Sequence, residues 1–147
     1  MAYEQLLQQG RIKPYRARLE EIRRLLKIAS RDLGTAERTL ANDADWAFTI
    51  AYNAVLQALR AIMLAKGFRP RGAEQHGTVV QFASEALGKP FADQVSMFDR
   101  MRRKRHRVVY ESAGLVSQQE AEQGLAFAKK FVEETRRLIS KQTSFKL

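Results

Sequence analysis

The stretch from Trp46 to Lys66 constrains the fold more than any other part of the sequence, because it is apolar on almost every side of a helix. A helix of this kind must be surrounded by protein, either in the middle of a bundle or across an interface between subunits. Asn53, Gln57 and Arg60 make it too polar for a membrane span, and Gly67 marks its end. We therefore expect Asn53 to be a hydrogen-bonded amide in the core, and the helix to form a homodimer interface.

The rest of the sequence also predicts helices. Residues 15–41 carry apolar side chains at steps of three and four, which is typical of a long amphipathic helix. A capping box at Ser117 and Glu120 opens the last helix, and either Asp43 or Asp45 is placed to cap the central one. Shorter helices are expected at residues 3–9, at residues 76–87 and from Phe91 to about Glu111.

No strand pattern, repeat or internal boundary interrupts these helices. The predicted fold class is therefore all-α, a four-helix bundle with a short extra N-terminal helix. A chain of 147 residues is the size of one ordinary domain. Within it, we expect residues 1–14 to form the N-terminal helix and a linker, and residues 141–147 to form a frayed tail.

Composition limits the chemistry and indicates the partners. The chain has no Cys and two His, which excludes disulfides, zinc thiolate sites and catalytic thiols, so we expect no metal centre and no cofactor. A formal charge of +10 favours phosphate-bearing partners, with RNA or a nucleotide first among them. The sequence shows neither a signal peptide nor a long apolar run free of charge, so we expect a cytoplasmic protein with no membrane segment.

The positive charge is concentrated at residues 100–107, where six side chains are Lys or Arg and none is acidic. At about 100° per residue, a helix places Arg102 and Arg105 on the same side as the apolar Phe98 and Val109. Arginines in such a position need a partner, because burial of an unpaired charge is costly. The other four fall on the opposite side, where we expect them to bind nucleic acid: Arg100, Arg103, Lys104 and Arg107.

Two interpretations of Arg102 and Arg105 stay open. One is a structural ion pair with an acid on a neighbouring helix, such as Asp32 or Asp45. The other is a functional cleft that both arginines line. His76, at the start of a short helix, is expected to act as a cap or as a hydrogen-bonding loop residue rather than as a catalyst.

Several segments, in order along nearly the whole chain, carry a resemblance to a known family. They are Leu-Leu-Gln-Gln-Gly at 6–10, Ala-Ser-Arg-Asp-Leu at 29–33, Asp-Trp-Ala-Phe-Thr-Ile-Ala-Tyr-Asn-Ala at 45–54, Lys-Gly-Phe-Arg-Pro at 66–70, His76, and Arg-Arg-Lys-Arg-His-Arg-Val-Val-Tyr-Glu at 102–111. The sequence resembles the HEPN family, and most closely its small stand-alone prokaryotic members, which are paired with minimal nucleotidyltransferases in toxin–antitoxin operons. The resemblance implies a four-helix bundle that dimerises, with a metal-independent ribonuclease site at the dimer cleft of active members.

The active motif of this family is an Arg with a His four to six residues after it. The best register here begins at Arg105, with His106 as its polar neighbour, and it puts Tyr110 where the His is expected. A second register joins Arg100 to His106, but these two residues lie about 120° apart on a helix. The resemblance therefore implies Arg105 as phosphate clamp, His106 as candidate base and Tyr110 as donor, with Arg100 and Arg102 as less favoured catalytic residues.

Two functions from different classes follow. The first is a weak or conditional ribonuclease toxin, whose activity suffers because Tyr, with a pKa of about 10, is a poor base at neutral pH. The second is a catalytically silent module that dimerises and presents the basic helix to RNA, to a nucleotide or to a nucleotidyltransferase partner. Under the first function, Tyr110→His is expected to increase cleavage.

Overall fold

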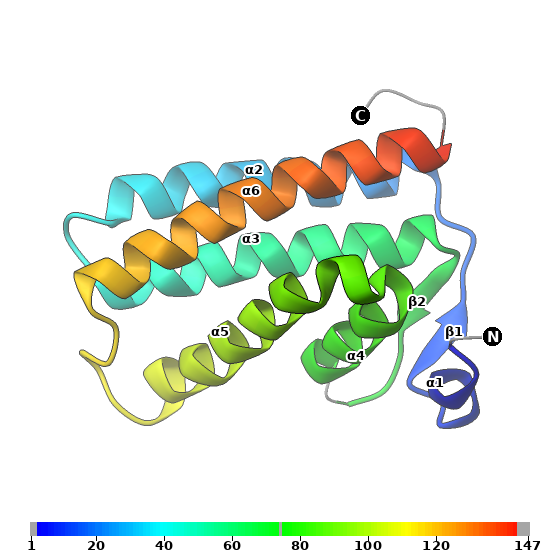
Figure 1. Ribbon diagram of the computed structural model, residues 1–147, viewed down its shortest axis with the longest axis horizontal. Helices are drawn as coiled ribbons and strands as arrows, with labels where there is room; N and C mark the ends of the chain where they lie inside the picture. Colours follow the sequence, from blue (N-terminus) through cyan, green and yellow to red (C-terminus); the bar gives the residue numbers. More distant parts are fainter. Residues whose placement is uncertain (1–2, 74, 144–147) are drawn as a thin grey trace.

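The computed structural model describes residues 3–73 and 75–143 and shows a bundle of α-helices with one very short sheet (Figure 1). This arrangement confirms the predicted all-α class with a short N-terminal helix. Along the chain the elements are α1 (Glu4–Gln8), β1 (Ile12–Pro14), α2 (Leu19–Thr39), α3 (Ala44–Ala65), β2 (Phe68–Pro70), α4 (Gln75–Leu87), the 3-10 helix η1 (Lys89–Phe91), α5 (Ala92–Tyr110) and α6 (Gln118–Thr143).

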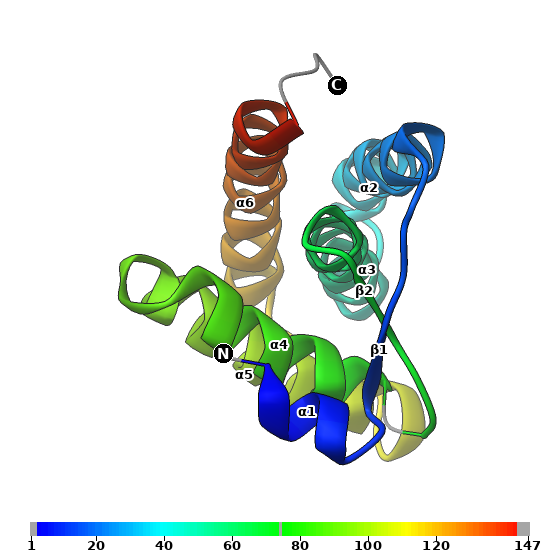
Figure 2. The ribbon, with the colours of Figure 1, turned by 90° about the vertical axis from the view of Figure 1, so that its right-hand side faces the viewer.

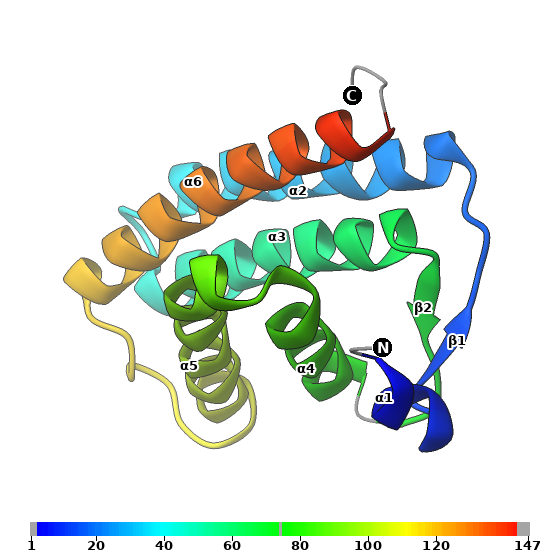
Figure 3. The ribbon, with the colours of Figure 1, turned by 45° about the vertical axis from the view of Figure 1, so that its right-hand side comes forward.

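The apolar helix α3 lies at the centre of the molecule. In Figure 3, α2 and α6 lie on one side of α3, and α4 and α5 lie on the other. Figure 2, which looks along the long helices, shows the same grouping, and α3 contacts each of these four helices. A single hydrophobic cluster results, with buried side chains from Leu6 in α1 to Ile139 in α6.

The apolar circumference of α3 is covered within one chain. Trp46 in its first turn is 58% exposed, but most of the helix is buried. By length and composition α3 is apolar enough to cross a membrane, yet its burial is that of the core helix of a soluble protein. One chain therefore covers most of this helix with α2, α4, α5 and α6, which removes the reason given for a homodimer interface along it, and that interface stays a prediction.

Capping side chains fix where two of the long helices begin. Of the two candidates, Asp43 caps α3, because its carboxylate accepts a hydrogen bond from the backbone N–H of Trp46 at 3.0 Å. The capping box at α6 is confirmed. The Ser117 hydroxyl accepts the N–H of Glu120 at 3.0 Å, and the Glu120 carboxylate accepts the N–H of Ser117 at 3.2 Å.

The sequence predicted no strands, but two strands of three residues each pair with one another. β1 and β2 are antiparallel, with Lys13 opposite Arg69. Each strand ends in a proline and is too short for an alternating pattern, so no sequence signal indicated the pairing. Because residues 12–14 are extended, α2 begins at Leu19 and not near Tyr15 as predicted.

The C-terminal helix also differs from the prediction. α6 continues to Thr143, so the helix does not end at residue 141, where fraying was expected. The remainder of the predicted tail, residues 144–147, lies outside the described residues.

The N-terminal segment holds α4 in place. The ring of Tyr3 stacks on that of Phe82 in α4, with 4.6 Å between the ring centroids. Arg11 donates to the hydroxyl of Thr78 at 3.1 Å and to the side-chain oxygen of Gln81 at 2.5 Å. The orientation of α4, which carries His76, therefore depends on residues at the start of the chain.

Candidate functional site

The basic helix α5 packs only its first half into the core. Val95, Phe98 and Met101 are buried, and in Figure 3 the helix then runs away from α3 toward its C-terminal end. Val109, which was predicted to face inward, is 40% exposed for this reason, and Tyr110 is 67% exposed. The last turn of α5 is therefore a solvent-facing surface.

The outer side of α5 carries the exposed cations. Arg100, Arg103 and Arg107 are exposed as predicted, and Arg103 pairs with Asp99 one turn earlier. Lys104 differs, because its side chain is only 25% exposed and its ammonium lies 3.0 Å from the Glu120 carboxylate of α6. Its charge is therefore partly engaged within the protein.

Of the two interpretations left open for the inner arginines, the structural ion pair with Asp32 or Asp45 is not formed. Asp32 accepts a hydrogen bond from the amide of Asn53 at 2.7 Å and pairs with Arg31 at 2.9 Å. The other candidate, Asp45, accepts the backbone N–H groups at residues 114 and 116, in the loop before α6. Arg102 pairs instead with an acid of its own helix, Asp99, at 2.9 Å.

Five side chains from three helices meet on the inner side of α5. Tyr52 and Arg60 come from α3, His76 from α4, and Arg102 and Arg105 from α5; we call this group the cationic cluster. The Tyr52 hydroxyl lies 2.8 Å from Nδ1 of His76, and the guanidinium carbon of Arg105 lies 5.8 Å from the centre of the Tyr52 ring. Three guanidinium groups therefore surround one Tyr–His hydrogen bond.

The cluster holds more positive charge than its own acid neutralises. Asp99 is shared between Arg102 and the exposed Arg103. The Nε atoms of Arg60 and Arg105 are buried, and no group among the described residues accepts a hydrogen bond from either. Buried donors are normally satisfied by protein, by ordered water or by an ion. Because the cluster has an excess of positive charge, an anion is the partner that its electrostatics favour.

Burial and the arginines set the protonation of the cluster. Burial raises the pKa of Tyr52 to about 12, although Arg105, Arg102 and Arg60 oppose the shift, so the phenol stays protonated. Burial is also the main reason why the pKa of His76 is lowered, and Arg60, Arg105 and Arg102 lower it further. His76 is therefore neutral at physiological pH, whereas the arginines keep their charge.

A family model for the HEPN domain matches residues 22–138, which is more than half of the chain and includes the whole cluster. The chain belongs to the HEPN domain family. HEPN domains are generally proteins that bind nucleotides or RNA, and they commonly form dimers. A comparison with curated proteins finds no match.

One solved structure gives a comparison for the fold. The protein described as TT1696 from Thermus thermophilus superposes with a TM-score of 0.58 at 24% identity, over 78% of this chain and 97% of that one. At this identity the likeness concerns the fold alone.

The HEPN motif positions are only partly brought together. The rings of His106 and Tyr110 lie 4.8 Å apart and both are exposed. Arg105 is directed toward Tyr52 in α3, so it does not join them within one protomer. Arg100 is exposed on the outer side and donates to the sulfur of Met97 at 3.5 Å.

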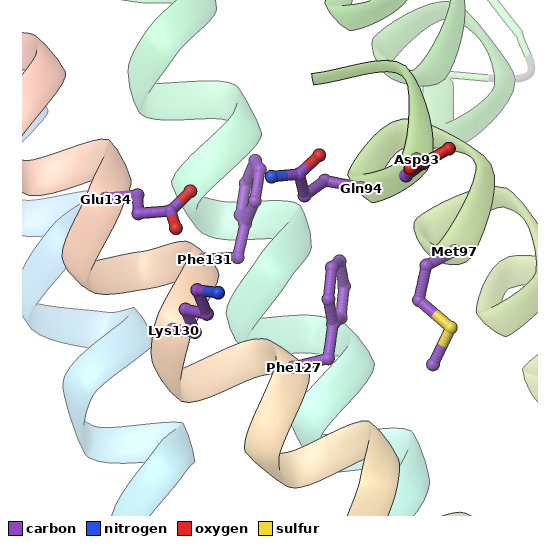
Figure 4. A pocket seen from close by; sticks show the side chains of 7 residues that line it. All are labelled: Asp93, Gln94, Met97, Phe127, Lys130, Phe131 and Glu134. Atoms are coloured by element: carbon purple, nitrogen blue, oxygen red, sulfur yellow. The ribbon is translucent and has the colours of Figure 1, made fainter. Parts of the chain in front are cut away.

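Among the hollows that border α5, two differ in charge. The hollow between α5 and α6, of about 280 Å³, is lined by the acids Asp93 and Glu134 beside Lys130, and two phenylalanines of α6 point into it (Figure 4). Its acids disfavour phosphate. The hollow between α4 and α5, of about 630 Å³, begins at Gly77 beside His76 and has Arg102 in its wall.

Sequence reasoning missed three members of the cluster as site residues: Tyr52, Arg60 and His76. A signal was present in α3, because Tyr52 and Arg60 are polar-tipped residues two helical turns apart in a stretch that is otherwise apolar. Among the described residues, no group of three or more His, Asp or Glu side chains is placed to hold a metal ion.

Proposed function

We propose that this HEPN protein binds RNA and cleaves it without a metal ion, with Arg105 as the phosphate clamp. The observation that carries the proposal is the buried Nε of Arg105, which has no hydrogen-bond partner among the described residues and belongs to the same cationic cluster as Arg60 and Arg102. A phosphodiester supplies the missing negative charge, and an arginine fork matches its geometry. Guanidinium groups held in place before the substrate arrives also stabilise the charge that develops on the phosphorus oxygens.

The exposed side of α5 supports RNA as the substrate. Arg100, Arg103 and Arg107 are exposed on one helix, where they can contact successive phosphates of a strand. Such contacts release condensed counterions, which gives affinity without a sequence preference. The net charge of +10 strengthens association with any phosphate polymer.

The same proposal includes the biological setting that the HEPN resemblance implies. The protein is then a cytoplasmic toxin component paired with a minimal nucleotidyltransferase, and it acts as a homodimer. Since α3 is enclosed within the bundle, the dimer would use a different surface. The exposed end of α5, with His106 and Tyr110, is a surface through which a second protomer would meet the motif residues.

A second function is a catalytically silent module that binds RNA or a nucleotide for its nucleotidyltransferase partner. It is favoured by one observation: the motif His is replaced by Tyr110, and neither His106 nor Tyr110 is close to the clamp that Arg105 forms with α3. The two functions share the same binding surface and differ in whether the phosphodiester is broken.

The test is incubation of the purified chain with single-stranded RNA in the presence of a chelator. Cleavage products in chelator, lost in Arg105→Ala, are the expected result. Binding without products in the wild type would instead establish the silent module. Failure of the wild type to bind RNA in low salt would contradict both functions.

A further inference from the structure

His76 occupies a position that a proton-transfer group would need. Its ring lies in the cationic cluster, where Nδ1 is 2.8 Å from the Tyr52 hydroxyl. Among the described residues no group bonds the other ring nitrogen, Nε2. One nitrogen is therefore held by the protein while the other is free, which is how a protein orients an imidazole for acid–base chemistry.

The surroundings of His76 suit a base that works beside a phosphate. Arg60 and Tyr52 face it from α3, and Arg102, Arg105 and Asp99 are on α5. On the side of the N-terminal segment, the guanidinium of Arg11 lies against Gly77, the next residue of α4. The guanidinium groups keep the imidazole uncharged, and they also attract the phosphodiester whose neighbouring hydroxyl has to lose its proton.

There is room for a nucleotide next to this histidine. The hollow between α4 and α5 measures about 630 Å³, and its lining includes Gly77, the residue that follows His76. Its walls include Val80 and Val95, which offer apolar contact to a base, and Ser84 and Ser96, which offer hydroxyl groups. A phosphate on the arginines would therefore place the attached ribose between His76 and this hollow.

His106 has none of these properties. It is exposed on the outer part of α5, and within the described part of the chain its one ring contact is with the exposed Tyr110. Arg105 is directed toward Tyr52 instead. The two histidines of the chain are thus in opposite situations, one within the cationic cluster and one on an open surface.

We propose that His76, rather than His106 or Tyr110, takes the proton of the ribose 2′-hydroxyl, and that Tyr52 is the residue that positions its ring. This inference rests on the ribonuclease function proposed above. The HEPN motif places a histidine at position 110, where this chain has Tyr110. The inference gives the role of that histidine to His76, which lies on a different helix.

The proposed step needs no further reactant. Nε2 of His76 accepts the 2′-hydroxyl proton, the 2′-oxygen forms a bond to phosphorus, and the bond from phosphorus to the 5′-oxygen breaks. Water gives a proton to the leaving 5′-oxygen, and the hydroxide that remains takes the proton back from His76. The products are a 2′,3′-cyclic phosphate and a 5′-hydroxyl. Arg105 and Arg60 hold the phosphorus oxygens while their negative charge increases.

Tyr52 has a defined part in this step. Its phenol stays protonated and shares one hydrogen bond with Nδ1 of His76, in a direction that depends on the tautomer. The proposed step uses the tautomer in which Nδ1–H donates to the Tyr52 oxygen, which leaves the lone pair on Nε2. In Tyr52→Phe this acceptor is lost, and the tautomer with the proton on Nδ1 is no longer favoured. The variant should keep its RNA affinity while the rate of cleavage falls and its dependence on pH changes.

The experiment compares RNA cleavage in chelator across pH 5–9 for the wild type, His76→Gln, Tyr52→Phe, His106→Gln and Tyr110→His, with the affinity for an all-2′-deoxy oligonucleotide measured in parallel. We expect His76→Gln to lower the cleavage rate by about 10²- to 10⁴-fold, the range of a lost general base, with little change in affinity. His106→Gln should lower the rate far less than His76→Gln, and Tyr110→His should give no gain.

A second measurement needs no substitution in the site. The chain has two histidines, so their ring signals in NMR spectra are assigned by means of His106→Gln. Addition of inorganic phosphate should move the signal of His76 and raise its pKa, because the anion offsets the arginine charges. The ring of His106 should respond less.

The outcomes separate this inference from the function on which it rests. Wild-type cleavage that survives in His76→Gln and is lost in His106→Gln, or is increased in Tyr110→His, would overturn the role of His76 and leave the ribonuclease in place. A His76 signal unmoved by phosphate while RNA is still cleaved would overturn it as well. A wild type that binds RNA and never cleaves it would overturn both proposals.

Discussion

Two neighbouring residues of α3, Tyr52 and Asn53, lead to two polar sites of opposite character. Asn53 donates to the buried carboxylate of Asp32, which also pairs with Arg31, so the one charge buried there meets both a donor and a cation. On the Tyr52 side, Asp99 pairs with Arg102 and with the exposed Arg103, and the buried Nε atoms of Arg60 and Arg105 have no acceptor within the described part of the chain.

The difference teaches how to separate structural from functional polar groups in this bundle. A buried charge that is fully paired is part of what holds the helices together, and its removal costs stability. An excess of positive or negative charge that the protein leaves unpaired lowers its stability. Such an excess is retained where a ligand supplies the opposite charge. The two sites therefore should respond in opposite ways to truncation.

The largest expected effect on stability is at Asn53 and Asp32, where the buried charge is paired. Asn53→Ala removes the donor that the buried Asp32 carboxylate accepts, so the free energy of unfolding should fall by about 2 kcal/mol, the value for a hydrogen bond to a charged group. Urea denaturation measures the loss, with Gln57→Ala on the same helix as the control. If Asn53→Ala and Gln57→Ala were equally stable, the Asn53–Asp32 pair would not be a stabilising site, and its contrast with the cationic cluster would be lost.

At the cationic cluster, Arg105→Ala should have little cost in stability, or increase it, because it relieves repulsion with Arg60 and Arg102. The affinity for single-stranded RNA should fall by about tenfold, which corresponds to one lost charge-assisted contact. Arg107→Ala, on the exposed side of the same helix, is the matched control for stability. A melting temperature well below the wild type for Arg105→Ala alone would show a structural role instead.

The exposed cations should each have a smaller effect on the salt dependence of RNA affinity, and these effects should add. If Arg100, Arg103 and Arg107 contact phosphates, each alanine variant should reduce the slope of log K against log salt by about 0.7, the value for one phosphate on a single strand. Lys104→Ala should reduce it less, because its ammonium pairs with Glu120. Fluorescence anisotropy over a range of KCl concentrations measures the slopes. A binding constant that is independent of salt would favour a protein partner for this surface.

The smallest expected effect is on how the free energy of unfolding depends on pH. The pKa of His76 is lower in the folded protein than its ordinary value of about 6.5, so the unfolded chain binds a proton more readily. The free energy of unfolding is unaffected by His76 above this pH and should decrease as the pH falls below it. His76→Gln should flatten the profile between pH 7 and 5.5, with His106→Gln as the control. An identical profile in His76→Gln and the wild type would contradict the assigned burial.

Much of the fold was predictable because its signals are local. The burial of α3 and the box at Ser117 and Glu120 each depend on nearby residues and were predicted correctly. The cap of α3 was narrowed to Asp43 or Asp45, and Asp43 forms it. The pairing of β1 with β2 was not predictable, because it joins two three-residue segments that lie far apart in the sequence.

The site was only half predictable for a related reason. Helical angles correctly placed Arg105 on the inner side of α5 and Arg107 on the outer side. They contain no information on which residue of another helix stands opposite, so Asp32 and Asp45 were wrongly proposed as partners. Recognition of His76 also required the packing of α4 against α3, which brings its ring to Tyr52.

The attachment of the N-terminal segment to α4 has a consequence for how the molecule opens. Tyr3, Arg11 and strand β1 contact α4 and β2, although they precede the region that the HEPN model matches. Local opening commonly involves contiguous cooperative units, and elements as short as α1, β1 and β2 are expected among the less stable ones. Backbone amides of α1, β1, β2 and α4 should therefore exchange with deuterium together, before those of α3. His76 belongs to this unit, so the histidine could move away from the arginines while the rest of the bundle stays folded.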